Sequence, residues 1–312
     1  MVYYQENIAL GSLSKIVLIS DLAEEKVEPV FRLLWQKIFS FEKQFSRFLP
    51  GSELSIFNRG SGIKQEISPE FKDLLAAAKS LSKTTSGIYN PFMLPAVQSA
   101  GYVNSRVPGF EHDQVDNHSG RNVVSFEKLE IGDTWAQIPY GTAIDLGGCG
   151  KGYLNEQLRR DIPESISGYW ISLGGDVALG GKNENDKPWE VNIENAWDKD
   201  KNTGKIITQG ISGVATSGVT VHRGKTGKQT WHHLIDPTTL KPAETDVLLA
   251  TVYDKSILRA DVLASCAVIL GSQAGLKFLR KQGVRGAVIQ SQNNKQSISH
   301  FGNGIIIETY YA

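Results

Sequence analysis

Short strand-like runs alternate with helical segments along this chain, without the regular spacing that βαβ units require. The runs 123–126, 169–173 and 247–253 are rich in aromatic and β-branched residues, which predicts strands, whereas 256–270 and 272–282 predict helices. Because parallel strands need a crossover connection, the irregular order favours mixed or antiparallel sheets with packed helices. The sequence therefore predicts an α+β fold. No internal repeat or linker-like composition interrupts it, so we expect a single domain over residues 1–312.

The N-terminal third carries the clearest local signals. Residues 7–20 are expected to be extended, and Ser68 followed by Pro69 predicts the start of a helix that ends near Gly87. Before it, apolar residues recur at gaps of three and four, which is typical of a helix that faces a core. This apolar stripe consists of Val27, Phe31, Leu34, Ile38, Phe41, Phe45 and Phe48.

Two polar segments are expected at the surface of the domain. Residues 101–122 are rich in Gly, Asn and His, which predicts a loop with little regular structure. Residues 182–205 are highly charged and predict a solvent-exposed hairpin whose charges solvate the surface.

The charge balance excludes several classes of partner. Lys and Arg number 33, as do Asp and Glu, whereas nucleic acids and anionic membranes are bound by an excess of basic residues. Apolar runs such as 264–270 fall far short of the roughly 20 residues that span a bilayer. Because neither a signal peptide nor a lipobox-like cysteine follows Met1, the sequence predicts a cytoplasmic protein. Cys149 and Cys266 have neither disulfide-framework nor metal-site spacing, and the sequence assigns them no role.

One glycine-rich run, 145–153, leads from a strand-like approach into a helix. It is not a P-loop, because Gly152 stands where Ser or Thr is required, and the chain has no Rossmann fingerprint, nucleophile elbow, HExxH or CxxC motif. Such a junction can present backbone N–H groups to an anion, and Lys151 adds a positive charge. A tight turn packed against a neighbour explains the glycines equally well.

Two further groups of polar residues suggest chemistry. Asp261 and Ser265 are four residues apart in a predicted helix, so their oxygens share one face and can bind one hard cation. The ordinary alternative is a solvated helix face. His232 and His233 precede an Asp-Pro turn and are candidates for a general base, although isolated histidines are more often structural.

Seven sequence blocks, taken together, resemble the FAD:protein FMN transferases of the ApbE type. Their order and spacing carry the resemblance, since each block alone is weak, and together they cover most of the chain. The blocks are FSRFLPGSELSIFN (45–58), GIYNPFMLP (87–95), DLGGCGKGY (145–153), SLGGD (172–176), VATSG (214–218), HLIDPTTLKP (233–242) and RADVLAS (259–265).

This resemblance implies an enzyme that binds FAD and Mg²⁺, cleaves the FAD pyrophosphate and attaches FMN through a phosphoester to a Ser or Thr of an acceptor protein, with AMP as the other product. Carried over by motif, Gly148 would offer a backbone oxygen to Mg²⁺, and Asp261 and Ser265 side-chain oxygens. His233 and Asp261 are then the catalytic candidates, with His232 as the fallback base. Thr216 and Ser217 are expected near the cofactor, but their hydroxyls could equally cap a turn.

For the flavin nucleotide, the resemblance implies a larger set of contacts. Phe48, Asn90, Ser265 and Leu10 stand where the family usually has Tyr, Asp, Thr and Met, respectively. Asn90 still hydrogen-bonds but carries no charge, and Phe48 stacks without a hydroxyl. The expected cofactor-binding residues are Leu10, Phe48, Ile88, Tyr89, Asn90, Asp145, Gly148, Lys151 and His233.

Three functions remain open at the level of the sequence. The first is the flavin transferase, which needs an acceptor with a segment resembling Asp-Gly-x-Thr/Ser-Gly-Ala-Thr/Ser, and this chain has no such segment. The second is an FAD pyrophosphatase, in which water replaces the acceptor and FMN and AMP are released. The third is a non-catalytic FAD-binding or structural protein.

Overall fold

The computed structural model describes residues 1–103, 123–220, 223–226 and 229–308. The chain forms two compact units. The first contains 1–40, 151–218 and 245–312, and the second contains 41–150 and 219–244. Two of the boundaries between the units fall inside helices. One lies after Ser40 in α1 (Glu24–Phe45), and the other lies after Gly150 in α5 (Gly150–Leu158).

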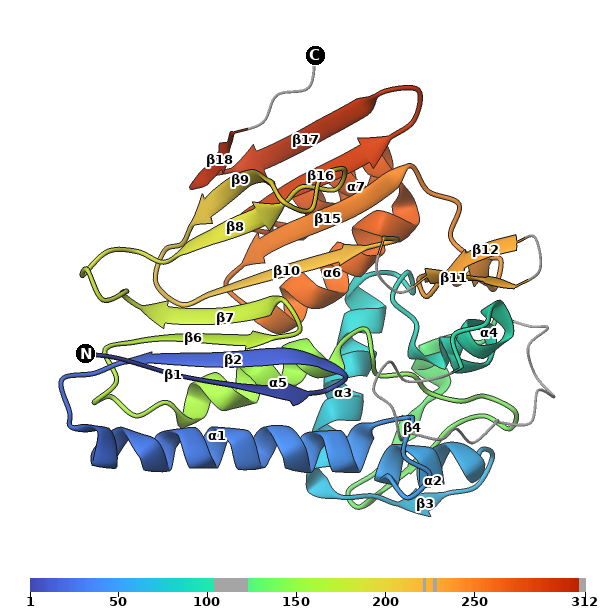
Figure 1. Cartoon of the computed structure of the whole chain (residues 1–312). Coiled ribbons are helices and arrows are strands. Elements are labelled where there is room, and N and C mark those ends of the chain that lie inside the picture. The colour runs from blue at the N-terminus through green and yellow to red at the C-terminus, as the bar shows by residue number, and fades with distance from the viewer. Residues whose placement is uncertain (104–122, 221–222, 227–228, 309–312) are drawn as a thin grey trace. The chain divides into compact units, whose positions relative to one another are not determined.

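An eight-stranded sheet forms the centre of the first unit (Figure 1). Every neighbouring pair in it is antiparallel, which is one of the two arrangements, mixed or antiparallel, that the sequence predicted. In spatial order its strands are β1 (Val2–Ala9), β2 (Ser12–Ile19), β6 (Gly168–Leu173), β7 (Asp176–Gly181), β10 (Ser212–Gly218), β15 (Val247–Asp254), β16 (Gly286–Gln292) and β17 (Gln296–Gly302).

Both faces of this sheet are covered within the first unit. On one face α6 (Ile257–Leu270) packs against β10 and β15, and α7 (Ser272–Gln282) packs against α6 and β16. At Gly213 a Cβ would lie 2.3 Å from the Cα of Ile257, so only glycine permits this approach of strand and helix. On the other face a small sheet of β18 (Ile305–Ile307), β9 (Asn202–Ile207) and β8 (Glu190–Glu194) covers an apolar core that includes Val214 and Tyr253. The short helix η3 (Arg159–Asp161) follows α5.

The second unit is mainly helical, with short strands. Ser68 caps α3 (Pro69–Thr84), as predicted, by accepting a hydrogen bond from the backbone of Phe71. The other helices are α2 (Glu53–Arg59), η1 (Pro91–Met93), α4 (Leu94–Ala100) and η2 (Phe126–Lys128). The strands are β3 (Gln65–Glu66), β4 (Glu130–Ile131) and β5 (Trp135–Gln137) in one sheet, and the pairs β11 (Arg223–Thr226) with β12 (Gln229–His232) and β13 (Ile235–Asp236) with β14 (Lys241–Pro242).

The α+β prediction is confirmed, with three local corrections. The extended segment expected over 7–20 is interrupted by a two-residue turn, because Leu10 and Gly11 both have positive φ. The hairpin expected within 182–205 exists as β8 and β9, but Val191 and Ile193 are buried, so one of its faces belongs to the core. The sequence 123–126 leads into η2 rather than forming a strand. Within the predicted loop 101–122, residues 104–122 lie outside the described part.

Candidate active site

Helix α6 positions the two residues that the sequence placed on one helical face. The side chain of Ser256 caps the helix by accepting from the backbone of Arg259. Asp261 and Ser265 follow one turn apart, only 4% and 9% exposed. The alternative of a solvated face is therefore wrong, because both residues are buried. An ionised carboxylate in such a position needs partners that stabilise its charge.

The first turn of α5 supplies one partner of Asp261 within the first unit. The backbone N–H of Gly152 donates to Oδ2 of Asp261 at 3.0 Å. A Cβ at position 152 would lie 2.8 Å from the Cα of Leu258 and 3.1 Å from the Cβ of Asp261. Gly152 is thus required for the close contact between α5 and α6 that this hydrogen bond needs.

A second buried carboxylate lies beside Asp261. Asp176, at the start of β7, has a side chain only 4% exposed and forms an ion pair with Lys151. Burial, together with the charge of Asp176, raises the pKa of Asp261 to about 8, although Lys151 and the N–H of Gly152 act in the opposite direction. With both groups ionised, two buried carboxylates next to one lysine carry a net negative charge, which a bound cation would neutralise.

Strand β10 contacts both Ser265 and Asp176. Oγ of Ser217 lies 2.9 Å from Oγ of Ser265, and Oγ1 of Thr216 lies 2.9 Å from Oγ1 of Thr251. The backbone N–H of Thr216 also donates to Oδ1 of Asp176 at 3.4 Å. Thr216 and Ser217 therefore belong to a strand and do not cap a turn.

These residues of the first unit fit a hard divalent cation. All the side-chain atoms that could bind a metal ion here are carboxylate or hydroxyl oxygens. Mg²⁺ is commonly held by one or two carboxylates together with substrate phosphates. Among the described residues, no three His, Cys, Asp or Glu side chains form a metal-binding group. A cation beside Asp261 would therefore also need hydroxyl, carbonyl or substrate oxygens. The sequence did not single out Asp176 as part of this set, although it closes the SLGGD block.

The glycine-rich run is mostly a packed turn in its first half. The N–H of Asp145 donates to the carbonyl oxygen of Pro91 at 2.8 Å, and Oδ1 of Asp145 accepts from Gly147 at 2.7 Å. The N–H groups of Cys149 and Gly150 both donate to the carbonyl oxygen of Leu146. Those N–H groups are already used inside the protein, which favours the packed-turn interpretation for them over a cradle for an anion. Cys149 and Cys266 are both buried.

The next predicted cofactor residues of the second unit lie close to this turn. The ring of Tyr89, the residue that follows Ile88, lies 3.4 Å from the position that a Cβ of Gly148 would occupy. Asn90 caps η1 through Oδ1, which accepts from the N–H of Phe92, while its Nδ2 donates to the carbonyl oxygen of Val124 at 2.9 Å. The amide of Asn90 therefore has structural partners.

Aromatic side chains gather around Tyr102 in the second unit. The ring centroid of Tyr102 lies 6.0 Å from that of Phe48, 6.1 Å from that of Trp231 and 6.2 Å from that of His233. All four rings are half-buried and so retain accessible surface. The sequence analysis predicted Phe48 and His233 but missed Tyr102 and Trp231, which stand outside the seven blocks.

The two adjacent histidines have different surroundings. Nε2 of His232 lies 3.0 Å from the carbonyl oxygen of Ala243, and burial lowers the pKa of His232. His233 instead follows the end of β12 and packs edge-on against Tyr102. This difference favours His233 over His232 as the residue available to a substrate. Leu10, predicted to contact the cofactor, occupies the turn between β1 and β2.

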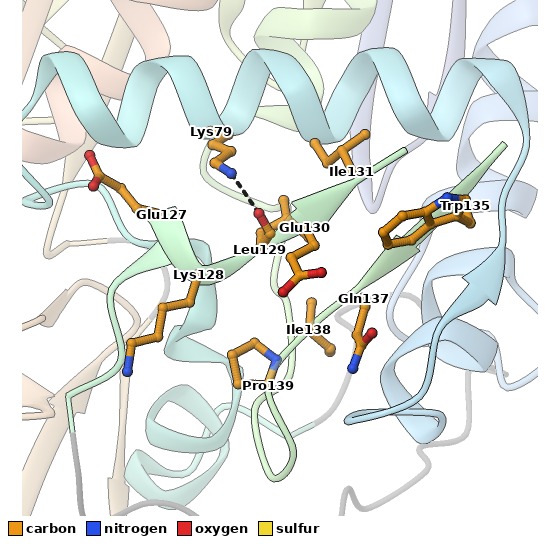
Figure 2. A pocket seen from close by; sticks show the side chains of 10 residues that line it. All are labelled: Lys79, Glu127, Lys128, Leu129, Glu130, Ile131, Trp135, Gln137, Ile138 and Pro139. Carbon is orange, nitrogen blue, oxygen red and sulfur yellow. Dashed lines mark hydrogen bonds between the residues drawn. The ribbon is translucent and has the colours of Figure 1, made fainter. Parts of the chain in front are cut away.

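An open hollow of about 670 Å³ lies elsewhere in the second unit, and Figure 2 shows its lining. The side chain of Lys79 extends from α3 and donates to the carbonyl oxygen of Leu129. None of the predicted site residues lines this hollow, so we do not regard it as the active site. Its lining residues are Lys79, Glu127, Lys128, Leu129, Glu130, Ile131, Trp135, Gln137, Ile138 and Pro139.

Comparison with known proteins decides the family. The model of the ApbE family matches residues 10–289. The chain belongs to the ApbE family. The resemblance of the seven sequence blocks is thereby confirmed.

Relatives within the ApbE family carry one functional name. The FAD:protein FMN transferase of Vibrio cholerae serotype O1 is 27% identical over 236 residues, covering 75% of this chain and 71% of the relative. That of Haemophilus influenzae is 24% identical over 289 residues, covering 88% and 80%.

Solved structures of the ApbE family share the fold. The flavinyl transferase ApbE of Pseudomonas stutzeri, in its apo form, superimposes with a TM-score of 0.80 at 20% identity, covering 97% of this chain and 95% of the other. The flavin transferase ApbE of Vibrio cholerae superimposes with a TM-score of 0.79 at 23% identity, covering 97% and 98%. Within the residues described, no helix combines the length and apolar character needed to cross a membrane.

Proposed function

We propose that this ApbE-family protein is an Mg²⁺-dependent FAD:protein FMN transferase. It cleaves FAD, attaches FMN through a phosphoester to a Thr or Ser of an acceptor flavoprotein, and releases AMP. The observation that carries the proposal is the buried, oxygen-only set around Asp261, in a chain whose relatives are named for this reaction. A buried pair of carboxylates serves no obvious purpose in a passive binding protein, but it suits a cation that stabilises phosphoryl transfer.

Asp261 and Ser265 are the proposed side-chain ligands of Mg²⁺, and the carbonyl oxygen of Gly148 is the proposed third protein ligand. Mg²⁺ supplies charge neutralisation for the pyrophosphate and its leaving group. Asp176 contributes negative charge to the set and orients Lys151 through their ion pair. The proposed role of Lys151 is to contact a phosphate oxygen, since it is a mobile point charge that exchanges partners readily.

His233 is the proposed general base. The acceptor hydroxyl oxygen forms a bond to the phosphorus on the FMN side of FAD, and the bond from that phosphorus to the bridging oxygen breaks. The hydroxyl proton passes to His233, and AMP leaves with the bridging oxygen. A histidine suits this step because its ordinary pKa lies near neutral pH.

The remaining predicted residues are proposed contacts of the flavin nucleotide: Leu10, Phe48, Ile88, Tyr89, Asn90, Asp145, Gly148 and His233. The accessible ring of Phe48, in its aromatic surroundings, supports a stacking role there. The structural partners of Asn90 and Asp145 support, in addition, a role in shaping the loops to which they belong.

The experiment that tests this proposal separates the products of FAD with and without an acceptor domain carrying the family's target segment. The transferase releases AMP in proportion to the acceptor and leaves little free FMN. Equal amounts of free FMN and AMP without an acceptor would establish a pyrophosphatase. Intact FAD that stays bound would establish a non-catalytic binding protein.

A pair of matched variants tests the base. We expect His233→Asn to lower the transfer rate by about 10²-fold or more, the usual contribution of a positioned acid–base group. His232→Asn serves as the control and should have a much smaller effect. Equal losses in both variants would contradict the assignment of His233.

A further inference from the structure

Arg47 is held at an unusual place in the second unit, between two aromatic rings. Its guanidinium carbon lies 4.1 Å from the ring centroid of Phe48 and 4.8 Å from that of Tyr102. Nε lies 3.4 Å from Oδ2 of Asp145, and Nη2 donates to the carbonyl oxygen of Tyr102 at 3.2 Å. The side chain is only 6% exposed. These contacts fix the guanidinium plane and leave it little freedom.

One nitrogen of this guanidinium has no acceptor among the described residues. Nη1 of Arg47 is buried and makes no hydrogen bond in the part of the chain that the structure describes. Buried donors are almost always paired, and arginine cannot lose its proton to avoid the cost. A buried, pre-oriented and unpaired donor therefore points to an acceptor oxygen that a ligand brings.

The surroundings indicate what kind of oxygen this is. The charge of Arg47 is already compensated by Asp145, so the site has little excess positive charge with which to attract a phosphate. The half-buried rings of Phe48 and Tyr102 lie against it, and Trp231 packs against Tyr102, which suits a flat aromatic ligand. A flat ring that carries an uncharged carbonyl oxygen satisfies both conditions.

We propose that Arg47 is a specificity-determining residue whose Nη1 donates a hydrogen bond to a ring carbonyl oxygen of the flavin. This inference rests on the proposed function, because it takes a flavin nucleotide as the substrate. Asp145 and Tyr102 act as positioning residues that hold the guanidinium in place. A site that hydrogen-bonds a substrate oxygen discriminates strongly against analogues that lack it.

The test measures ligand binding to the full chain by titration calorimetry. The probes are riboflavin, ADP, and riboflavin analogues in which the oxygen at ring position 2 or 4 is replaced by sulfur, a weaker acceptor. We expect wild-type protein to bind one thio analogue about 10-fold more weakly than riboflavin, as for loss of a hydrogen bond from a charged donor. Arg47→Lys should weaken riboflavin binding about 10-fold, leave ADP binding within 2-fold, and remove the discrimination between riboflavin and that analogue.

Arg59→Lys is the matched control, because Arg59 is an exposed arginine of the same unit whose substitution should change none of these affinities. Equal binding of riboflavin and both analogues by wild-type protein would overturn the proposal without recourse to any variant. So would an Arg47→Lys variant that loses ADP but not riboflavin, which would assign Arg47 to a phosphate. Absence of riboflavin binding also overturns it. Discrimination by Arg47 in a protein that transfers no FMN would instead leave this inference standing and contradict the proposed function.

Discussion

Replacing the buried Asp261 by asparagine should stabilise the metal-free protein at neutral pH while abolishing its response to Mg²⁺. Asparagine is nearly isosteric and keeps an oxygen that can accept from the N–H of Gly152. It removes, however, a carboxyl group whose ionised form is disfavoured by burial and by the charge of Asp176. The substitution therefore tests the electrostatic cost of burying the carboxyl group while its packing stays nearly unchanged.

The direction and size of the effect follow from the pKa of Asp261, which is raised from 3.8 to about 8. The folded state binds this proton more tightly than the unfolded chain, so wild-type stability declines as the pH rises from about 4 to about 8. Three pH units, from about 4 to 7, at about 1.4 kcal/mol each, set an upper limit of about 4 kcal/mol at pH 7. The attraction of Lys151 is already included in this pKa, and the net gain expected is about 1–4 kcal/mol. The melting temperature should rise by at least about 2 °C.

The assay is thermal unfolding after treatment with a chelator, at pH 4.5 and pH 7, with and without added Mg²⁺. The variant should exceed the wild type at pH 7, approach it at pH 4.5 and gain nothing from Mg²⁺, whereas the wild type should gain. Asp246→Asn is the control, because Asp246 accepts hydrogen bonds from the backbone and hydroxyl of Ser272 and should show no such gain. A metal-free Asp261→Asn protein less stable than wild type at pH 7 would refute the electrostatic reasoning.

Three further predictions concern packing and the metal ligands. Asn58→Ala should lower the free energy of unfolding by about 1–3 kcal/mol in urea denaturation, because the buried N–H and carbonyl of Ile144 lose their side-chain partners; an unchanged midpoint would contradict this. Gly152→Ala should reduce both stability and activity, since its Cβ would lie 2.8 Å from the Cα of Leu258; wild-type melting and turnover would show that the helices can separate freely. Ser265→Thr should retain Mg²⁺-dependent activity whereas Ser265→Ala should need more Mg²⁺, and identical Mg²⁺ titrations would remove the hydroxyl from the ligand set.

The sequence predicts the helices better than the strands, and the reason is physical. The apolar stripe that begins at Val27 and the cap at Ser68 are local signals, so α1 and α3 are recognisable without tertiary context. Pro29, the sixth residue of α1, lies inside the helix although proline removes one intrahelical N–H there, so the apolar stripe outweighs this local signal. Strands β7 and β10 contain glycines and small residues, and their strand conformation depends on neighbours far away in the sequence.

The same distinction between local signals and tertiary packing applies to the candidate site. A spacing of four residues on one helix was enough to place Asp261 and Ser265 on one face, but their burial depends on β10, β15 and α5, which no local pattern reveals. Asp176 and Tyr102 join their sites through tertiary packing alone. Residues that act through their neighbours are therefore the ones that sequence patterns miss.

The central claim is that this protein transfers FMN from FAD to an acceptor in a reaction that depends on Asp261. Its most direct test is the intact mass of an acceptor domain after incubation with the protein, FAD and Mg²⁺. We expect the acceptor to gain the mass of FMN less water, and Asp261→Ala protein, checked for folding by its melting temperature, to leave the acceptor unchanged. An acceptor unmodified by wild-type protein, or modified equally by the Asp261→Ala variant, would contradict the claim.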